Sequence, residues 1–222
     1  MSSAKVPFQR SGVKSLTQAL RRGPPLIHVL LGPRQVGKTT AARQIAASWG
    51  GKTHYASADA PLPPGPEWIQ AQWNLAQSEP QKGSETLLVL DEIQKVRGWT
   101  EGLKAAWDGS VGKARTLRVL VLGSSSLLVQ SGLKESLAGR FFIHRMGHWS
   151  WPEMSEAFGW DLDRWLALGG YPASAALARN TETWSRYITD SLIDSVIARD
   201  VLQMTRVSKP ALMRQLFGLA VG

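Results

Sequence analysis

The sequence contains no cysteine, and this absence excludes disulfide-stapled folds, cysteine zinc sites and thiol catalysis. It also has no apolar run that approaches the roughly 18 residues of a membrane-spanning helix. The first residues, MSSAKVPFQRSG, lack the apolar segment of a secretory signal. We therefore expect a soluble protein of the cytoplasm that does not associate with membranes.

The composition is that of a folded protein with an uneven charge. Of the 222 residues, 43% are hydrophobic and 19% charged, which is enough to bury a core and excludes wholesale disorder. Residues 1–150 carry 19 basic and 9 acidic side chains, whereas residues 151–222 carry 7 and 8. A basic first part favours polyanionic ligands, such as nucleotide phosphates or a nucleic-acid backbone.

Short apolar runs alternate with helical patterns in the first 150 residues, which indicates βαβ units and a parallel sheet. The fold class we predict is α/β, with five strands: Leu26–Leu31, Lys52–Ala56, Leu87–Leu90, Leu117–Leu122 and Phe141–Met146. The helices we expect here are Val13–Arg22, Thr39–Trp49, Trp68–Gln77 and Trp99–Trp107. The proline-rich stretch 60–66 is predicted to be a surface loop.

From about Trp151 onward the pattern becomes purely helical. Asp161–Leu168 and Glu182–Gln203 are predicted helices, separated by the turn at 169–172. Pro210 begins a further apolar helix that reaches the last residue without a polar tail. We accordingly expect a core domain over 1–150 and a helical lid or linker over 151–222. The apolar end predicts that the chain is truncated from a longer protein or that its last helix pairs with a partner.

The strongest motif is GPRQVGKT at residues 32–39, which matches the phosphate-binding loop pattern G-x-x-x-x-G-K-[ST]. It lies between an apolar strand and a helix, as that loop requires. Its glycines let backbone N–H groups surround phosphates at a helix N-terminus, while Lys38 reaches the β- and γ-phosphates and Thr39 ligates magnesium. The predicted nucleotide-binding residues are Gly32, Pro33, Arg34, Gln35, Val36, Gly37, Lys38, Thr39 and Thr40.

A second motif places two carboxylates after the apolar run Leu87–Leu90. Ligands of parallel sheets bind at the C-terminal ends of the strands, where Asp91 and Glu92 would lie. Asp91 would hold Mg²⁺, directly or through water, and Glu92 would act as the general base on the attacking water. The alternative is a surface acidic pair that only ends a strand. The GTPase motif N-K-x-D is absent, which favours ATP.

Two further positions are candidate catalytic residues, each with a structural alternative. Ser124 or Ser125, after the run Leu117–Leu122, would hydrogen-bond the γ-phosphate or its attacking water, or else cap the next helix. Arg140 would stabilise transition-state charge in its own subunit or a neighbour's, or else form a salt bridge. Arg199 is a weaker candidate for the same role. Zinc binding by His144 and His148 is not expected.

The motifs taken in order resemble a known family. The series is GPRQVGKTT, LLVLDEIQKVRGW followed by LK and Asp108, LGSSS, ESLAGR, GGYP and IARD. It resembles the prokaryotic ATPases of the AAA superfamily that carry a C-terminal domain of unknown function, from about residue 10 to 222. The stretch 141–151 departs from the usual family pattern.

The resemblance implies an additional-strand P-loop core, in which the first strand lies between the fourth and the fifth, together with a helical lid. It implies site roles for the matching positions Lys38, Thr39, Asp91, Glu92, a serine at 124 or 125, and Arg140. Family members usually continue beyond such a chain, into a winged-helix-like segment and the C-terminal domain. Any role that family members perform with those two segments is not assigned to this chain.

Together these observations predict an enzyme that binds ATP and Mg²⁺, hydrolyses the γ-phosphate and couples nucleotide state to a protein or DNA partner. A homo-oligomer is compatible with this prediction. One alternative is a slow or non-hydrolysing nucleotide-dependent switch or adaptor. Another is a nucleic-acid-binding module whose basic residues track phosphates. A kinase fits less well, because Glu92 and the serines suit water as the nucleophile.

Overall fold

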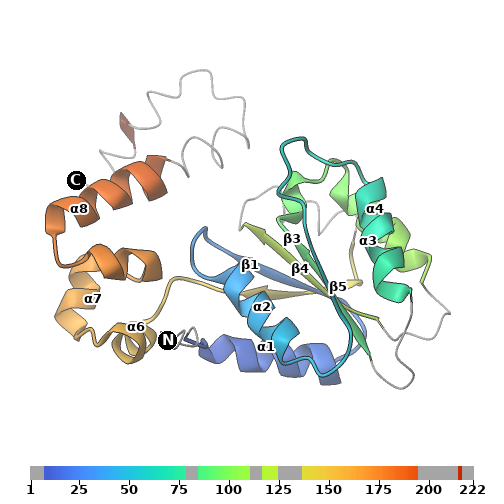
Figure 1. Cartoon of the computed structure of the whole chain (residues 1–222), viewed down its shortest axis with the longest axis horizontal. Coiled ribbons are helices and arrows are strands. Elements are labelled where there is room, and N and C mark those ends of the chain that lie inside the picture. The colour runs from blue at the N-terminus through green and yellow to red at the C-terminus, as the bar shows by residue number, and fades with distance from the viewer. Residues whose placement is uncertain (1–7, 79–84, 111–116, 125–136, 195–214, 217–222) are drawn as a thin grey trace, which may run out of the picture. The chain divides into compact units, whose positions relative to one another are not determined.

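The computed structural model describes residues 8–78, 85–110, 117–124, 137–194 and 215–216 (Figure 1). Contacts between residues divide the chain into two compact units. The first comprises Met1–Pro33, Gly37–Ser125 and Val129–Gly147, and the second comprises Arg34–Val36, Ser126–Leu128 and His148–Gly222.

The first unit contains a five-stranded sheet. Its strands are β1 (Ile27–Gly32), β2 (Thr53–Ser57), β3 (Thr86–Asp91), β4 (Leu117–Ser124) and β5 (Phe141–Arg145). Neighbouring strands are parallel, in the order β2-β3-β4-β1-β5. All five predicted strands are present, with ends that differ by at most two residues, and β1 lies between β4 and β5 as the family resemblance implied.

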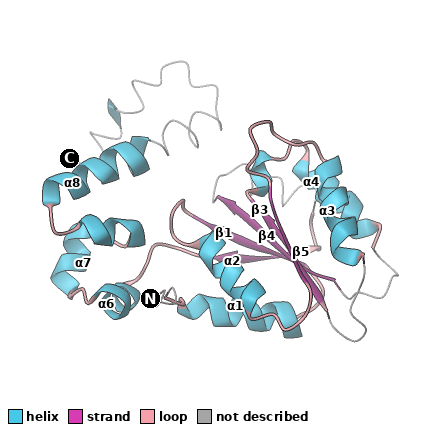
Figure 2. Ribbon diagram, in the orientation of Figure 1, coloured by secondary structure: helices cyan, strands magenta, loops and turns pink. Residues whose placement is uncertain are grey.

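Helices cover both faces of this sheet. Figure 2 shows α1 (Ser11–Arg22) and α2 (Lys38–Ala47) on one side, and α3 (Glu67–Gln77) and α4 (Trp99–Asp108) on the other. Every residue of β1 and β3 is buried, which explains why their sequences are continuous apolar runs rather than alternating ones. Because all strands run the same way, their C-terminal ends share one edge of the sheet, where β1 leads into α2.

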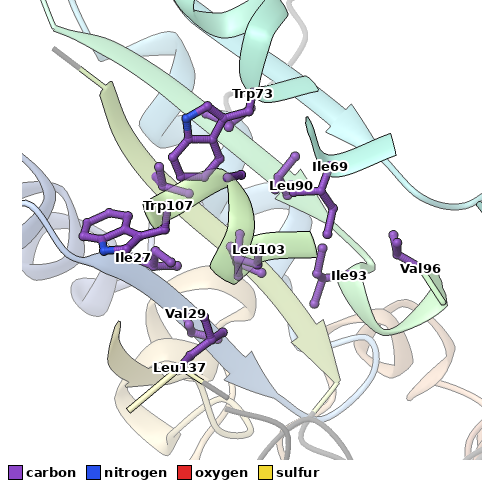
Figure 3. Close-up of a cluster of buried hydrophobic side chains, with 14 of the residues drawn as sticks. Ile27, Val29, Ile69, Trp73, Leu90, Ile93, Val96, Leu103, Trp107 and Leu137 are labelled. Atoms are coloured by element: carbon purple, nitrogen blue, oxygen red, sulfur yellow. The ribbon is translucent and has the colours of Figure 1, made fainter. Parts of the chain in front are cut away.

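The core of this unit lies between the sheet and helices α3 and α4 (Figure 3). The rings of Trp73 and Trp107 meet edge to face, with centroids 6.5 Å apart. The Trp73 indole N–H donates to the Ser110 hydroxyl at 2.8 Å, so this large side chain is buried with its polar atom satisfied. The other labelled members are Ile27, Val29, Ile69, Leu90, Ile93, Val96, Leu103 and Leu137.

From Trp151 onward, the described part of the second unit is mainly helical. It contains α6 (Trp151–Phe158), α7 (Leu162–Leu168), the 3₁₀ segment η2 (Pro172–Leu177), α8 (Thr181–Arg186) and the π-helical segment η3 (Tyr187–Ile193). Another 3₁₀ turn, η1 (Ile93–Lys95), follows β3 in the first unit. Among the described residues, no helix is both long and apolar enough to cross a membrane.

Two parts of the second unit differ from the sequence prediction. The helix expected over Glu182–Gln203 is α-helical only to Arg186 and then widens into η3; its residues from 195 onward lie outside the described part. Helix α6 was not predicted. Its signal is Ser150 followed by Pro152 and Glu153, since the Glu153 carboxylate accepts the Ser150 backbone N–H at 3.0 Å, a reciprocal cap typical of helix starts.

Candidate nucleotide-binding site

The predicted phosphate-binding loop connects β1 to α2. Gly37, with φ of 98°, precedes the helix, and this left-handed backbone is strained for any residue with a Cβ atom. At the other end, a Cβ on Gly32 would lie 2.0 Å from the Met146 carbonyl oxygen. Both glycines are therefore required by the geometry of the loop.

Lys38 is the first residue of α2. Its ammonium group donates hydrogen bonds to the carbonyl oxygens of Gly32 at 2.9 Å and Pro33 at 2.6 Å. The charge therefore lies over the loop and near the positive end of the helix dipole. A helix N-terminus and a lysine together attract a phosphate group.

Asp91, from the predicted carboxylate motif, contacts the end of the phosphate-binding loop motif. It is the last residue of β3 and is 6% exposed. Its Oδ2 atom accepts a hydrogen bond from the Thr39 hydroxyl at 2.9 Å, and its Oδ1 atom accepts the Glu92 backbone N–H at 2.9 Å. A buried carboxylate beside a hydroxyl supplies the oxygen ligands that Mg²⁺ prefers. The two predicted metal ligands thus fit that ion.

Tyr55 is a site residue that sequence reasoning missed. Its hydroxyl donates to Asp91 Oδ2 at 2.5 Å. Burial raises the pKa of this phenol, and the hydrogen bond to Asp91 raises the pKa further. The signal that could have identified Tyr55 is its position in the predicted second strand. That strand, β2, pairs with β3 so that Ser57, two residues after Tyr55, lies beside Asp91. Arg43 lies over the Tyr55 ring, 5.8 Å from its centroid.

Glu92 directly follows β3 in a left-handed backbone conformation, with φ of 55°. Such a conformation is uncommon for a residue with a side chain and is often found at functional sites. The Glu92 carboxylate accepts a hydrogen bond from the Gln94 side-chain amide at 2.5 Å. The candidate base is therefore held by a neighbour two residues away.

Ser124 lies next to the loop. It is the last residue of β4, it is buried, and it pairs in register with Gly32 of β1. The structure therefore brings Ser124 to the edge that carries Lys38 and Asp91. Ser125 lies outside the described residues, as does Arg199.

Arg140 is not brought to this edge. Its carbonyl oxygen accepts the backbone N–H of Ile27, the first residue of β1, at 2.9 Å. The loop follows the last residue of that strand, and a strand of this length spans about 17 Å. The guanidinium group instead forms a salt bridge with Asp108 at 2.9 Å. A role for Arg140 in the site of its own subunit is incompatible with this position.

The comparison with protein families finds two domains in the chain. The AAA domain family matches residues 25–155, and a domain of unknown function, DUF8612, matches residues 159–222. Two relatives are the uncharacterized proteins Rv2008c of Mycobacterium tuberculosis and Mb2031c of Mycobacterium bovis. Each is 30% identical over 207 residues, which is 93% of this chain and 43% of the relative. The chain thus spans less than half the length of these relatives.

Solved structures of the RuvB Holliday junction branch migration motor from Thermotoga maritima are also similar. One is 24% identical, covers 68% of this chain and 49% of that chain, and has a TM-score of 0.46. A point variant of it is 23% identical, with the same coverage and a TM-score of 0.47. The AAA domain family matches more than half of the chain, and this match assigns the protein to that family. The chain belongs to the AAA domain family, and residues 25–155 form its AAA domain.

Proposed function

We propose that this domain binds Mg-ATP and hydrolyses its γ-phosphate. The observation that carries the proposal is the hydrogen bond from Thr39 to Asp91, which joins the phosphate-binding loop to the carboxylate strand. Lys38 would bind the β- and γ-phosphates, because its ammonium already lies over the loop. Thr39 and Asp91 would hold Mg²⁺, which supplies positive charge to the phosphate oxygens when bound.

The remaining groups at this edge would act on the water nucleophile. Glu92 would accept the proton of the attacking water, since it lies one residue beyond the proposed metal ligand Asp91. Ser124 would donate a hydrogen bond to the γ-phosphate or to that water, because it lies beside the first residue of the loop. Ser125 is proposed for the same role from the sequence alone.

Arg140 is proposed to act only in trans. Arg140 lies at the end of the sheet opposite the phosphate-binding loop, so it does not reach the nucleotide of its own subunit. It would instead stabilise charge on the nucleotide of a neighbouring subunit. This role requires a homo-oligomer. We further propose that 151–222 serves as a helical lid or linker, which would couple nucleotide state to a protein or DNA partner.

A nucleotide-dependent switch with slow turnover is a second candidate. The hydrogen bond from Gln94 to Glu92 favours it, because an amide that holds the carboxylate competes with the water that Glu92 would activate. In this reading nucleotide binding alters a partner surface and hydrolysis is slow until a partner frees Glu92. The two candidates share the binding site and differ in the rate of turnover.

The test of the shared binding site is a titration of fluorescent ATP in the presence of Mg²⁺. Lys38→Ala should weaken ATP binding by about 100-fold or more, because it removes a charge-assisted contact with two phosphates. The matched control is Lys14→Ala, since Lys14 is an exposed lysine on α1. Unchanged affinity in Lys38→Ala would contradict the phosphate-binding role.

A further inference from the structure

The Tyr55 hydroxyl lies against both groups that we assign to the metal. It donates to Asp91 Oδ2 at 2.5 Å, and the Thr39 hydroxyl lies within hydrogen-bonding reach of it. Thr39 itself donates to the same Oδ2 atom at 2.9 Å. The hydroxyl of a third residue, from a different strand, therefore occupies the junction between the two proposed ligands.

These contacts use up the acceptor capacity of the Asp91 oxygen that faces Thr39. A carboxylate oxygen has two lone pairs, and Oδ2 already accepts two hydroxyl donors. The other oxygen, Oδ1, accepts the Glu92 backbone N–H. A cation that approaches Asp91 from the Thr39 side, or a water bound to that cation, must replace one of these donors.

Tyr55 is the donor that can be replaced without breaking the fold. Thr39 is fixed in the first turn of α2, whereas Tyr55 belongs to β2, an edge strand of the sheet. The Tyr55 side chain is only partly buried. Its ring can therefore rotate away from Asp91 while the strand keeps its pairing with β3.

We propose that the Tyr55 hydroxyl competes with a divalent cation for Asp91, so that the nucleotide-free site binds a free cation weakly. Tyr55 is then a positioning residue for Asp91, and its hydroxyl sets the affinity of the nucleotide-free site for a divalent cation. This inference rests on the proposed Mg-ATP function, which assigns the metal to Thr39 and Asp91. Nucleotide phosphates supply further cation ligands, and these shift the competition in favour of the metal.

The test is a titration of the folded protein with Mn²⁺ alone, in which free Mn²⁺ is measured by electron paramagnetic resonance without nucleotide. Tyr55→Phe keeps the ring and removes the hydroxyl, so its Mn²⁺ affinity should rise about tenfold, the size expected for one hydrogen bond to a charged group. Tyr171→Phe removes a hydroxyl in the second unit and should leave the affinity unchanged. Tyr55→Leu should show the same gain as Tyr55→Phe.

Asp91→Asn in the Tyr55→Phe background locates the gain. If the gain disappears, the added affinity belongs to the Asp91 carboxylate, as proposed. If the gain persists, or if Tyr55→Phe binds Mn²⁺ no more tightly than the wild type, the competition is overturned. Wild-type binding of Mg-ATP is measured in parallel, because its loss would refute the proposed function, whereas its retention without a Mn²⁺ gain would refute only the role of Tyr55.

Discussion

The Thr39 hydroxyl lies 2.9 Å from Asp91 Oδ2, although 52 residues separate the two positions in the chain. The sheet makes this contact possible, because β1 and β3 end at the same edge and the helix that follows β1 starts there. The contact ties the phosphate-binding loop to the carboxylate strand. Variants that disturb this edge should therefore impair nucleotide binding first.

Gly32→Ala is expected to damage both the fold and the site. The new Cβ would lie 2.0 Å from the Met146 carbonyl oxygen, and Met146 is itself hydrogen-bonded to Leu31 at 2.8 Å, so the backbone cannot easily move aside. Such overpacking costs about 1–3 kcal/mol. Urea unfolding should show this loss, and ATP binding should weaken with it.

Gly12→Ala is the matched control for that variant. Gly12 is an exposed residue of α1, and a Cβ there would meet nothing within 4 Å. Alanine favours a helix over glycine by about 1 kcal/mol, so this variant should be neutral or more stable. If Gly32→Ala is as stable as Gly12→Ala, the close approach at Gly32 does not constrain the loop.

A histidine pair between β1 and β5 should make stability depend on pH. His28 Nδ1 lies 2.8 Å from His144 Nε2. Burial, with smaller contributions from the positive charges of His144 and Arg118, lowers the pKa of His28 from 6.5 to about 4. The unfolded chain therefore binds more protons than the folded protein between these pH values. The free energy of unfolding should fall by about 2–3 kcal/mol as the pH drops through this window.

Unfolding in urea at several pH values within this window measures the effect. His28→Leu should lose much of the fall in stability, since it removes the buried titrating group. His54→Leu, on the edge strand β2, is the control and should keep the wild-type slope. A His28→Leu variant that retains the full slope would show that other groups cause the acid sensitivity.

Removal of the Arg140 side chain should separate ATP binding from catalysis. Arg140 lies at the sheet edge opposite the loop, and its salt bridge with Asp108 is partly exposed. Arg140→Ala should therefore change stability by no more than about 1 kcal/mol and leave ATP affinity within about twofold. Hydrolysis should decline only at protein concentrations where subunits associate. A loss of ATP affinity comparable to that of Lys38→Ala would contradict this placement.

The sequence was most informative where local pattern and chemistry coincide. The apolar runs before Gly32 and Asp91 predicted buried parallel strands, and the loop glycines predicted a backbone that the structure shows at Gly37. Strand order also agreed, through the family resemblance. These features depend on short segments, each of which carries its own signal.

Features that depend on pairing across the fold were not predictable in the same way. Tyr55 is one tyrosine in an edge strand, and its contact with Asp91 follows only from the register of β2 against β3. Arg140 is the last residue of the family motif ESLAGR. The register of β1 against β5 nevertheless places it at the end of the sheet opposite the phosphate-binding loop. The π-helical segment Tyr187–Ile193 has the spacing of an ordinary helix and left no signal of its widening.

The most direct test of the account is steady-state ATP hydrolysis by the wild type and Glu92→Gln, with binding of Mg-ATP measured on the same samples. Glu156→Gln, an exposed residue of α6, is the matched control. Glu92→Gln should bind Mg-ATP with wild-type affinity and hydrolyse it about 100-fold or more slowly, because an amide cannot accept the proton of water. Undiminished turnover in Glu92→Gln would contradict the assignment of Glu92 as the base.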